Sequence, residues 1–278
     1  MSEDQPPSFT RFDAVLWSAG VTFAFLLTAS AFFERGEDVD VVKFIGIQVA
    51  VYLLACTLFS WRRAGRNFSE VFGLRGTSPW LFLLALLLGP ALFGPVETLS
   101  RITEHFAPEP VKQTEAALAA MMPKSQLHAV LLFVGVAVGG PLAEELFFRG
   151  ALYTALRPLF GAVSSVWTVT LCFTLCHPQP RNWLQILLPA LVLSVVRAVS
   201  GSLWAGFCTH FSFNAAQLAA LWVVKGKAVA VPLSFEIGGW ALTLTVLGAL
   251  LFVAKKSPRA AQARAVDEVA PPAATPDA

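Results

Sequence analysis

Eight long apolar segments divide this chain, and each is nearly free of charged residues. A helix needs about 20 apolar residues to cross the hydrocarbon core of a bilayer. Most of the segments reach that length, and the shorter ones reach it if flanking residues join the helix. Lipid offers no hydrogen-bond partner to an open backbone, so we expect helices. The segments are residues 12–33, 41–61, 79–99, 127–143, 161–176, 183–196, 203–224 and 238–254.

The chain carries too little charge for a water-soluble protein of its size. Charged residues make up 14% of it and hydrophobic residues 56%, whereas a soluble domain has about 25% charged residues. We therefore predict an all-α fold, a polytopic membrane helix bundle with about eight transmembrane helices. Membrane lipid is an expected partner. The formal net charge of +2 argues neither for nor against nucleic acid, and no nucleic-acid partner is predicted.

Three regions are predicted along the chain: an N-terminal leader (1–11), a transmembrane domain (12–256) and a disordered C-terminal tail (257–278). Residues 1–10 contain no basic residue, which does not fit a cleavable signal peptide. The tail turns to alanine, proline and scattered charge, a composition that cannot bury a core. With the N-terminus in the cytoplasm, twelve Lys and Arg residues fall on that side and eight on the other. This bias favours a multi-pass protein of the cell membrane with both termini cytoplasmic.

Ionisable side chains at bilayer depth are costly unless they are paired or hydrated, so they are candidates for function. No aspartate lies deep in any apolar segment, which disfavours an aspartyl protease. The sequence has neither an HExxH zinc motif nor a GxSxG nucleophile motif, and its four cysteines lie in apolar segments, where no disulfide framework is expected. The polar residues that remain are Glu144, Glu145, Arg149, His177, Arg197, His210 and Asn214.

Two adjacent carboxylates and an arginine make the first cluster. On a helix Glu145 and Arg149 are i,i+4 neighbours in the favourable order, so Arg149 can hold the Glu145 carboxylate charged and oriented. Glu144 points about 100° away and is free to face a cavity, where it could act as a general base. A salt-bridged helix end at the membrane interface explains the same residues equally well.

The second and third clusters each place an imidazole on a helix. Phe173 lies one turn before His177 and can pack against its ring, although a histidine at a helix end is the simpler interpretation. His210 and Asn214 are i,i+4 neighbours in the middle of an apolar segment. That pair fits either catalysis or a hydrogen bond between helices.

Chain spacing links the first two clusters. Glu144 and His177 are 33 residues apart, and the midpoint falls at residues 160–161, just after Pro158. Pro and Gly are expected at the turn of a helical hairpin. Each residue then lies about 24 Å from the turn at 1.5 Å per residue. The two side chains should therefore be level across an antiparallel pair, and helix tilt is needed to bring His210 to the same depth.

In this order the clusters resemble the three motifs of the CPBP (CAAX-protease and bacteriocin-processing) family, over about residues 127–224. That family includes CAAX prenyl endopeptidases, bacteriocin-immunity proteins and enzymes suggested to process C-terminal sorting signals. The run from Glu144 to Gly150 is especially similar to bacterial members. The resemblance implies an intramembrane endopeptidase, in a bacterial inner membrane, that hydrolyses a peptide bond in a membrane-embedded or lipid-linked protein substrate. The matching residues are Glu144-Glu145-xxx-Arg149, Phe173-xxx-His177 and His210-xxx-Asn214.

The resemblance also implies a role for each motif. Glu144 with His177 would activate a water molecule, His210 and Asn214 would stabilise the oxyanion, and the second glutamate and the arginine of the first motif would orient Glu144. A zinc ion is the alternative, with Glu144, His177 and His210 as ligands and an open fourth position for water. The family has been described in both ways. The sequence leaves both open, and we slightly favour the chemistry without a cofactor.

The competing hypothesis is a non-enzymatic membrane protein, an immunity or transport protein that uses the same polar cavity for binding. A transporter would more naturally have internal repeats and paired helices interrupted by Gly or Pro. Neither feature is evident in the sequence.

Overall fold

The computed structural model describes residues 9–32, 40–62, 68–177, 179–227, 229 and 231–268. These residues form helices and contain no strand, which confirms the predicted all-α class. Two of the elements, η1 and η2, are π-helices, and η3 is a single 3₁₀ turn. The elements are α1 (Arg11–Phe32), α2 (Val41–Arg62), α3 (Phe68–Phe72), α4 (Pro79–Ala91), α5 (Phe93–Phe106), α6 (Val111–Ala120), α7 (Gln126–Phe133), η1 (Val134–Gly139), α8 (Gly140–Glu145), η2 (Leu146–Leu152), α9 (Tyr153–Leu175), η3 (Pro180–Asn182), α10 (Trp183–Ser200), α11 (Leu203–Val223), α12 (Leu233–Lys256) and α13 (Pro258–Glu268).

Six helical stretches in the described part of the chain are long and apolar enough to cross a membrane. One of them, Gln126–Leu175, is 50 residues long and contains two of the predicted segments. The helix α11 is not among the six because its histidine, asparagine and glutamine side chains lower its hydropathy, although it covers another predicted segment. The observed helices therefore agree roughly with the predicted eight spans, and the protein is a multi-pass membrane protein.

The long stretch turns back on itself at the predicted hairpin. Gly161 has φ 73° and ψ 173° inside α9, a backbone conformation that glycine adopts without strain and other residues do not. Pro158 lies three residues earlier in the same helix. The hairpin expected at residues 160–161 is therefore confirmed, and it returns the end of α9 to the level of α8.

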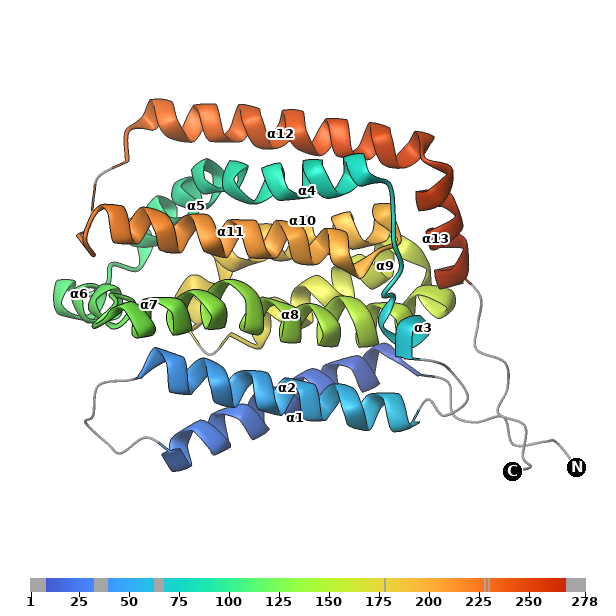
Figure 1. Ribbon diagram of the computed structural model, residues 1–278, viewed down its shortest axis with the longest axis horizontal. Coiled ribbons are helices and arrows are strands. Elements are labelled where there is room, and N and C mark those ends of the chain that lie inside the picture. Colours follow the sequence, from blue (N-terminus) through green and yellow to red (C-terminus); the bar gives the residue numbers. More distant parts are fainter. Residues whose placement is uncertain are drawn as a thin grey trace, which may run out of the picture.

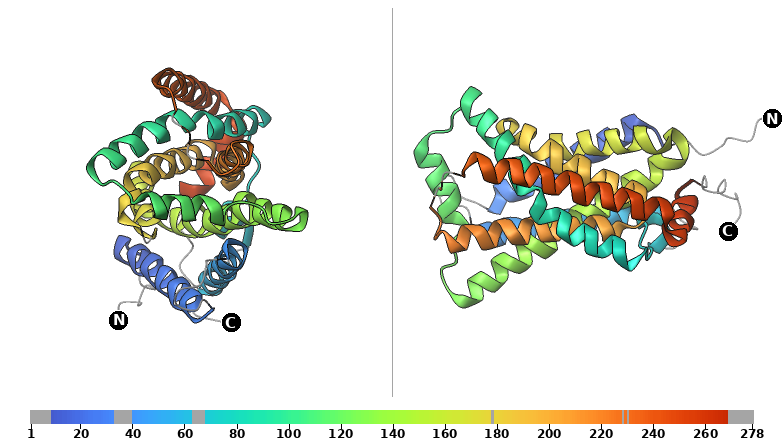
Figure 2. Two further views of the ribbon diagram at one scale, coloured as in Figure 1. Left: turned by 90° about the vertical axis from the view of Figure 1, so that its left-hand side faces the viewer. Right: turned by 90° about the horizontal axis from the view of Figure 1, so that it is seen from above.

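The helices run along one common direction and stack in layers (Figures 1 and 2). The helix α12 lies on one outer side, α4 and α5 follow, α10 and α11 form the middle, and α1 and α2 lie beyond α8. The α4–α11 crossing is very close, because a Cβ atom on Gly89 of α4 would overlap Ser212 and Phe213 of α11. Small residues allow helix backbones to approach in this way within membranes.

The described chain begins and ends at the same end of the bundle (Figure 1). The guanidinium of Arg11, at the start of α1, lies 4.6 Å from the ring centroid of Phe160. Nearby, Arg157 pairs with Glu268 at the end of α13 over 2.6 Å. The first and the last described helices therefore meet at the same end of the bundle. Most of the predicted leader, residues 1–8, lies outside the described residues.

The C-terminal helix α13 corrects the predicted tail. Disorder was expected from residue 257, but residues Pro258–Glu268 form a helix that packs against the end of the bundle. Asp267 is buried there, with its carboxylate 2.7 Å from Arg75 and 2.7 Å from Arg197. Composition did not reveal this, because α13 is anchored by a charge whose partners lie far away in the sequence. Residues 269–278 lie outside the described residues.

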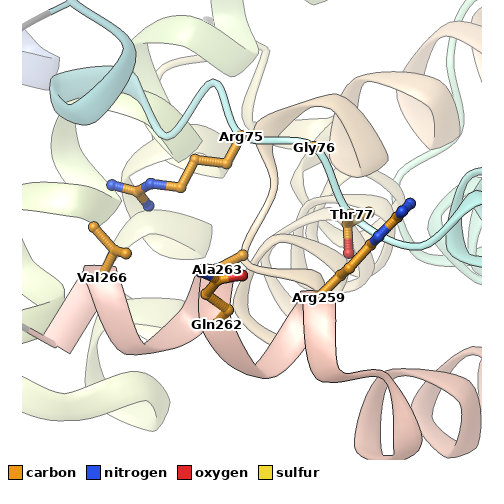
Figure 3. A pocket seen from close by; sticks show the side chains of 7 residues that line it. All are labelled: Arg75, Gly76, Thr77, Arg259, Gln262, Ala263 and Val266. Carbon is orange, nitrogen blue, oxygen red and sulfur yellow. The ribbon is translucent and has the colours of Figure 1, made fainter.

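An open cavity beside α13 is lined by Arg75, Thr77, Arg259 and Gln262 (Figure 3). The guanidinium groups of Arg75 and Arg259 point in opposite directions, and Arg75 is already bound to Asp267. The basic groups of this cavity therefore do not converge on a common point. Arg75 instead helps to hold α13 against the bundle through its bond to Asp267.

Candidate active site

The predicted residues from three separate helical segments meet at one cavity of about 440 Å³. Glu144 of α8, His177 at the end of α9, and His210 and Asn214 of α11 all line it. Helices α5 and α10 supply its other walls. The expected convergence on one pocket is therefore observed, and His210 lies beside both acids of the first cluster.

Glu144 is held from two sides. Its Oε1 atom accepts a hydrogen bond of 2.7 Å from the side-chain amide of Gln48 in α2. Its Oε2 atom lies 3.7 Å from Nε2 of His210. The sequence does not single out Gln48, because it is neutral and no motif accompanies it in its apolar segment. An amide in the middle of an apolar segment was the only signal available.

Glu145 and Arg149 form the predicted i,i+4 pair. Arg149 Nη1 lies 2.9 Å from Glu145 Oε1, and both side chains are 0% exposed. Arg149 also donates from Nη2 to the carbonyl of Ala190 (2.9 Å) and contacts Ser194 through Nε (3.4 Å), both in α10. Its guanidinium lies 4.3 Å from the ring centroid of Phe173. The arginine therefore ties the Glu145 carboxylate to α10.

The backbone around these acids departs from the regular helix assumed in the sequence analysis. The six-residue helix α8, which carries both glutamates, lies between the π-helices η1 and η2. Such π-helical turns are rare and occur frequently at functional sites. Arg149 lies in η2, where the helix is wider than a regular α-helix. Its ion pair with Glu145 is nevertheless present.

His210 bridges the two acids. Its Nδ1 atom lies 3.1 Å from Glu145 Oε1 and its Nε2 atom faces Glu144. Because Glu145 is paired with Arg149, it is the natural acceptor for a proton on Nδ1. The contact fixes the plane of the ring, so Nε2 is directed to the carboxylate that lines the cavity. Glu145 Oε2 has no hydrogen-bond partner among the described residues.

His177 is fixed in the same manner by its own helix. Nδ1 lies 2.9 Å from the carbonyl oxygen of Phe173, and a carbonyl can only accept, so Nδ1 carries the proton and Nε2 remains for other partners. The predicted packing of Phe173 on His177 is observed, with ring centroids 4.9 Å apart. The same phenylalanine contacts His210 at 6.1 Å between centroids.

Asn214 continues the wall one turn beyond His210. Its Nδ2 atom donates a hydrogen bond of 2.9 Å to the carbonyl of Val136 in η1. One of the two amide protons is used in this bond, which leaves the other for a group in the cavity. Asn214 therefore forms the hydrogen bond between helices that was the alternative interpretation. It also lines the cavity.

Other polar side chains within or beside the apolar segments lie elsewhere. The buried Arg197 pairs with Asp267 at the end of the bundle. His128 Nδ1 accepts a hydrogen bond from the backbone of Lys124, outside the cavity. Glu236 forms an ion pair with Arg101. Within the described ranges, no three His, Cys, Asp or Glu side chains lie close enough together to hold a metal ion.

A membrane bundle in which one acid and two imidazoles line a cavity, with a second acid buried behind them, is the arrangement expected of an intramembrane hydrolase. The comparison with known families agrees: residues 126–216 match the family described as Rce1-like, "Type II CAAX prenyl endopeptidase Rce1-like". The match confirms the resemblance to the CPBP family over a third of the chain. None of the curated proteins and none of the solved structures matches the chain. The matched segment contains all six predicted site residues, but not Gln48.

Proposed function

We propose that this protein is an intramembrane endopeptidase that hydrolyses a peptide bond in a membrane-embedded or lipid-linked protein substrate. The family match supports a CAAX-protease-like intramembrane endopeptidase in general. The observation that carries the specific proposal is the 3.7 Å contact of Glu144 with His210 in a cavity that His177 also lines. A cavity inside a helix bundle reaches substrates that are themselves held in the membrane.

The proposed reaction begins with a water molecule in the cavity. Glu144, together with His177, takes a proton from the water while its oxygen attacks the scissile carbonyl carbon. The resulting tetrahedral intermediate bears a negative oxygen, to which a protonated Nε2 of His210 and the second amide proton of Asn214 would donate. In other hydrolases one such donor is worth about 2.7–4 kcal/mol. The proton held by Glu144 then passes to the leaving nitrogen, and the peptide bond breaks.

Three further residues keep this arrangement in place. Gln48 donates to Glu144 Oε1, so the free lone pairs of that carboxylate are directed into the cavity. Glu145 sets the orientation of the His210 ring, and Arg149 holds Glu145. A carboxylate with a fixed orientation needs little reorganisation when it accepts a proton, which is the advantage of a preorganised site.

A zinc reaction would use Glu144, His177 and His210 as ligands, and zinc would supply a bound hydroxide near neutral pH. The described residues do not bring three such side chains into one coordination sphere. The proposed reaction therefore relies on side chains to activate the water. Cleavage that survives treatment with a chelator would support this, and cleavage restored only by added Zn²⁺ would overturn it.

The proposed site is tested by single substitutions in protein reconstituted into lipid vesicles. The probe is a quenched fluorescent peptide with a farnesylated cysteine. Glu144→Gln, His177→Ala and His210→Ala should each lower the cleavage rate by at least about 100-fold, the usual contribution of a general acid or base. His128→Ala, a histidine outside the cavity, is the matched control and should cleave normally.

Two outcomes would contradict the proposal. Cleavage that continues in all three variants would exclude this cavity as the active site. A wild-type protein that binds the peptide without cleaving it would instead favour the binding function of an immunity or transport protein. Because one outcome concerns the residues and the other the activity, the two failures can be told apart.

A further inference from the structure

The cavity has a second group of polar side chains that the proposed reaction does not use. They lie on α5, η3 and α10, and none of them forms a hydrogen bond or ion pair with the acids and imidazoles of the proposed reaction among the described residues. On α5 the cavity is lined by Glu97 and Ser100, at the end of η3 by Asn182, and on α10 by Gln185. Glu97 and Ser100 lie before the segment that matches the Rce1-like family.

Glu97 is a carboxylate without a partner in the described part of the protein. Within the described ranges no hydrogen bond or ion pair reaches it, although two arginines lie in the same region. Arg101, one turn further along α5, is paired with Glu236. Arg181, just before α10, is paired with Glu104 and Glu109. The nearby positive charges are therefore already neutralised, and Glu97 presents its charge to the cavity.

Gln185 also lines this cavity, and its side chain carries an acceptor that is not satisfied. Its Nε2 atom donates a hydrogen bond of 2.9 Å to Asn182 Oδ1. This donation assigns the nitrogen end of the amide, so the other end is the carbonyl oxygen. That oxygen is buried and has no donor among the described residues. A buried acceptor of this kind needs a donor from water or from a ligand.

We infer that Glu97 and Gln185 form a subsite for a positively charged group of the substrate, a lysine or arginine side chain near the scissile bond. The inference rests on the proposed function. Both unpartnered groups are acceptors, and an ammonium or guanidinium group is a donor that carries the complementary charge. No lysine or arginine is among the residues that line the cavity. An acidic substrate residue there would meet Glu97 and Glu144 without a counter-charge.

The subsite should act on substrate binding and not on the chemical step. Glu97 does not contact the residues proposed to activate water, so its contribution is equal in the bound substrate and in the transition state. Loss of such uniform binding raises KM and leaves kcat unchanged. Glu97 is therefore a specificity-determining residue, and its effect differs in kind from that of Glu144.

The test uses three quenched farnesylated peptides that differ at one position, two residues from the scissile bond, where they carry lysine, norleucine or glutamate. Wild-type protein in neutral-lipid vesicles should cleave the lysine peptide with a KM about 10-fold below that of the norleucine peptide, the effect of one charge-assisted contact. The glutamate peptide should have the highest KM. Glu97→Gln should remove the lysine preference, and Glu97→Lys should reverse it in favour of glutamate.

Glu115→Gln, which removes an exposed carboxylate of α6 outside the cavity, is the matched control and should keep the lysine preference. Equal KM values for the three peptides in wild-type protein, or an unchanged lysine preference in Glu97→Gln, would overturn the subsite and leave the proposed peptidase intact. If wild-type protein cleaves none of the peptides, fluorescence anisotropy of the same peptides decides the subsite separately. Binding that favours lysine in wild-type protein but not in Glu97→Gln supports it, and binding that is indifferent to charge excludes it.

Discussion

Arg149 and Arg197 are both completely buried, and each is held by a carboxylate, yet their surroundings differ. Arg149 shares Glu145 with His210, which lines the cavity. Arg197 binds both oxygens of Asp267, with its Nη1 and Nη2 atoms 2.7 Å and 3.0 Å from them. Asp267 also accepts from Arg75. We call the first group the site cluster and the group of Arg75, Arg197 and Asp267 the end cluster.

The two clusters differ in how many of their carboxylate oxygens accept a hydrogen bond. In the end cluster both oxygens of Asp267 accept hydrogen bonds from arginine. In the site cluster Glu145 Oε2 has no partner among the described residues, and Nε2 of the attached His210 faces Glu144, which lines the cavity. A saturated ion pair mainly holds elements together, whereas one with unused acceptors beside a cavity can take part in chemistry. The clusters meet at one point, where Arg197 Nε donates to the backbone oxygen of Arg149 over 3.1 Å.

The largest effects are expected when each buried arginine loses its carboxylate. Glu145→Gln and Asp267→Asn keep the side-chain shape and leave a buried guanidinium without its counter-charge. Breaking a buried pair in this way costs about 3–5 kcal/mol, so both variants should unfold at clearly lower temperature than wild-type protein in detergent. Only Glu145→Gln also frees the His210 ring, so only this variant should lose cleavage at a temperature where both remain folded.

Cleavage separates the two clusters more sharply than stability does. If folded Asp267→Asn loses cleavage as completely as Glu145→Gln, the end cluster is part of the catalytic support. The contact between Arg197 and the backbone of Arg149 would then be the route of that effect. If Glu145→Gln cleaves normally, the orientation of His210 does not depend on Glu145.

The contacts that sequence reasoning predicted are those that are local in the chain. The Glu145–Arg149 pair follows from helix spacing, and the level of Glu144 and His177 follows from a hairpin with a glycine at its turn. The contacts that it missed join distant positions. Gln48 and Glu144 are 96 residues apart, and Asp267 is 70 residues from Arg197. Hydropathy places such residues in a span or a tail but does not indicate which side chain they meet.

The π-helices on either side of α8 were also beyond the sequence, because hydrophobic patterning in a bundle of apolar helices carries little periodic signal. They change the direction of side chains by widening a turn, so an expectation based on 3.6 residues per turn holds only for close neighbours. The Glu145–Arg149 pair survives this change. The hydrogen bond from Arg149 to the carbonyl of Ala190 in α10 depends on how the helices pack, which the sequence does not reveal.

A smaller effect is expected from Gln48, which supports the site cluster from outside the matched segment. Gln48→Leu removes one hydrogen bond to a carboxylate, worth about 1.5–3 kcal/mol. Because the bond orients Glu144 and does not bind substrate, kcat should fall by about 10- to 100-fold while KM is maintained. Thr57→Val is the control on the same helix, since the Thr57 hydroxyl bonds only to the backbone of its own helix at Leu53.

Two results would contradict the proposed role of Gln48 in orienting Glu144. A rise in KM with normal kcat would place Gln48 in substrate binding. Unfolding at a much lower temperature than wild-type protein would make it a packing residue of α2. Either result would remove it from the groups that orient Glu144.

The smallest expected effect is the response of the end cluster to acid. Burial acts to raise the pKa of Asp267, but the charges and hydrogen bonds of Arg197 and Arg75 outweigh it, so the pKa lies below its usual value. A carboxyl with a depressed pKa stabilises the fold above its unfolded pKa, and this contribution is lost as pH falls through the folded pKa. Docking of α13 should therefore be constant from neutral pH to about pH 4, the usual Asp value, and weaken only below it.

Hydrogen exchange followed by mass spectrometry can measure this docking, after correction for the intrinsic effect of pH. Exchange in residues 258–268 should accelerate below pH 4 before that of α10 does, and Asp267→Asn should exchange rapidly in α13 at every pH. The pair of Arg157 with the exposed Glu268 is the other carboxylate contact of this helix, and exposed pairs contribute little. Acceleration already between pH 7 and pH 5 would mean that a different titrating group holds α13, because Asp267 remains ionised throughout that range.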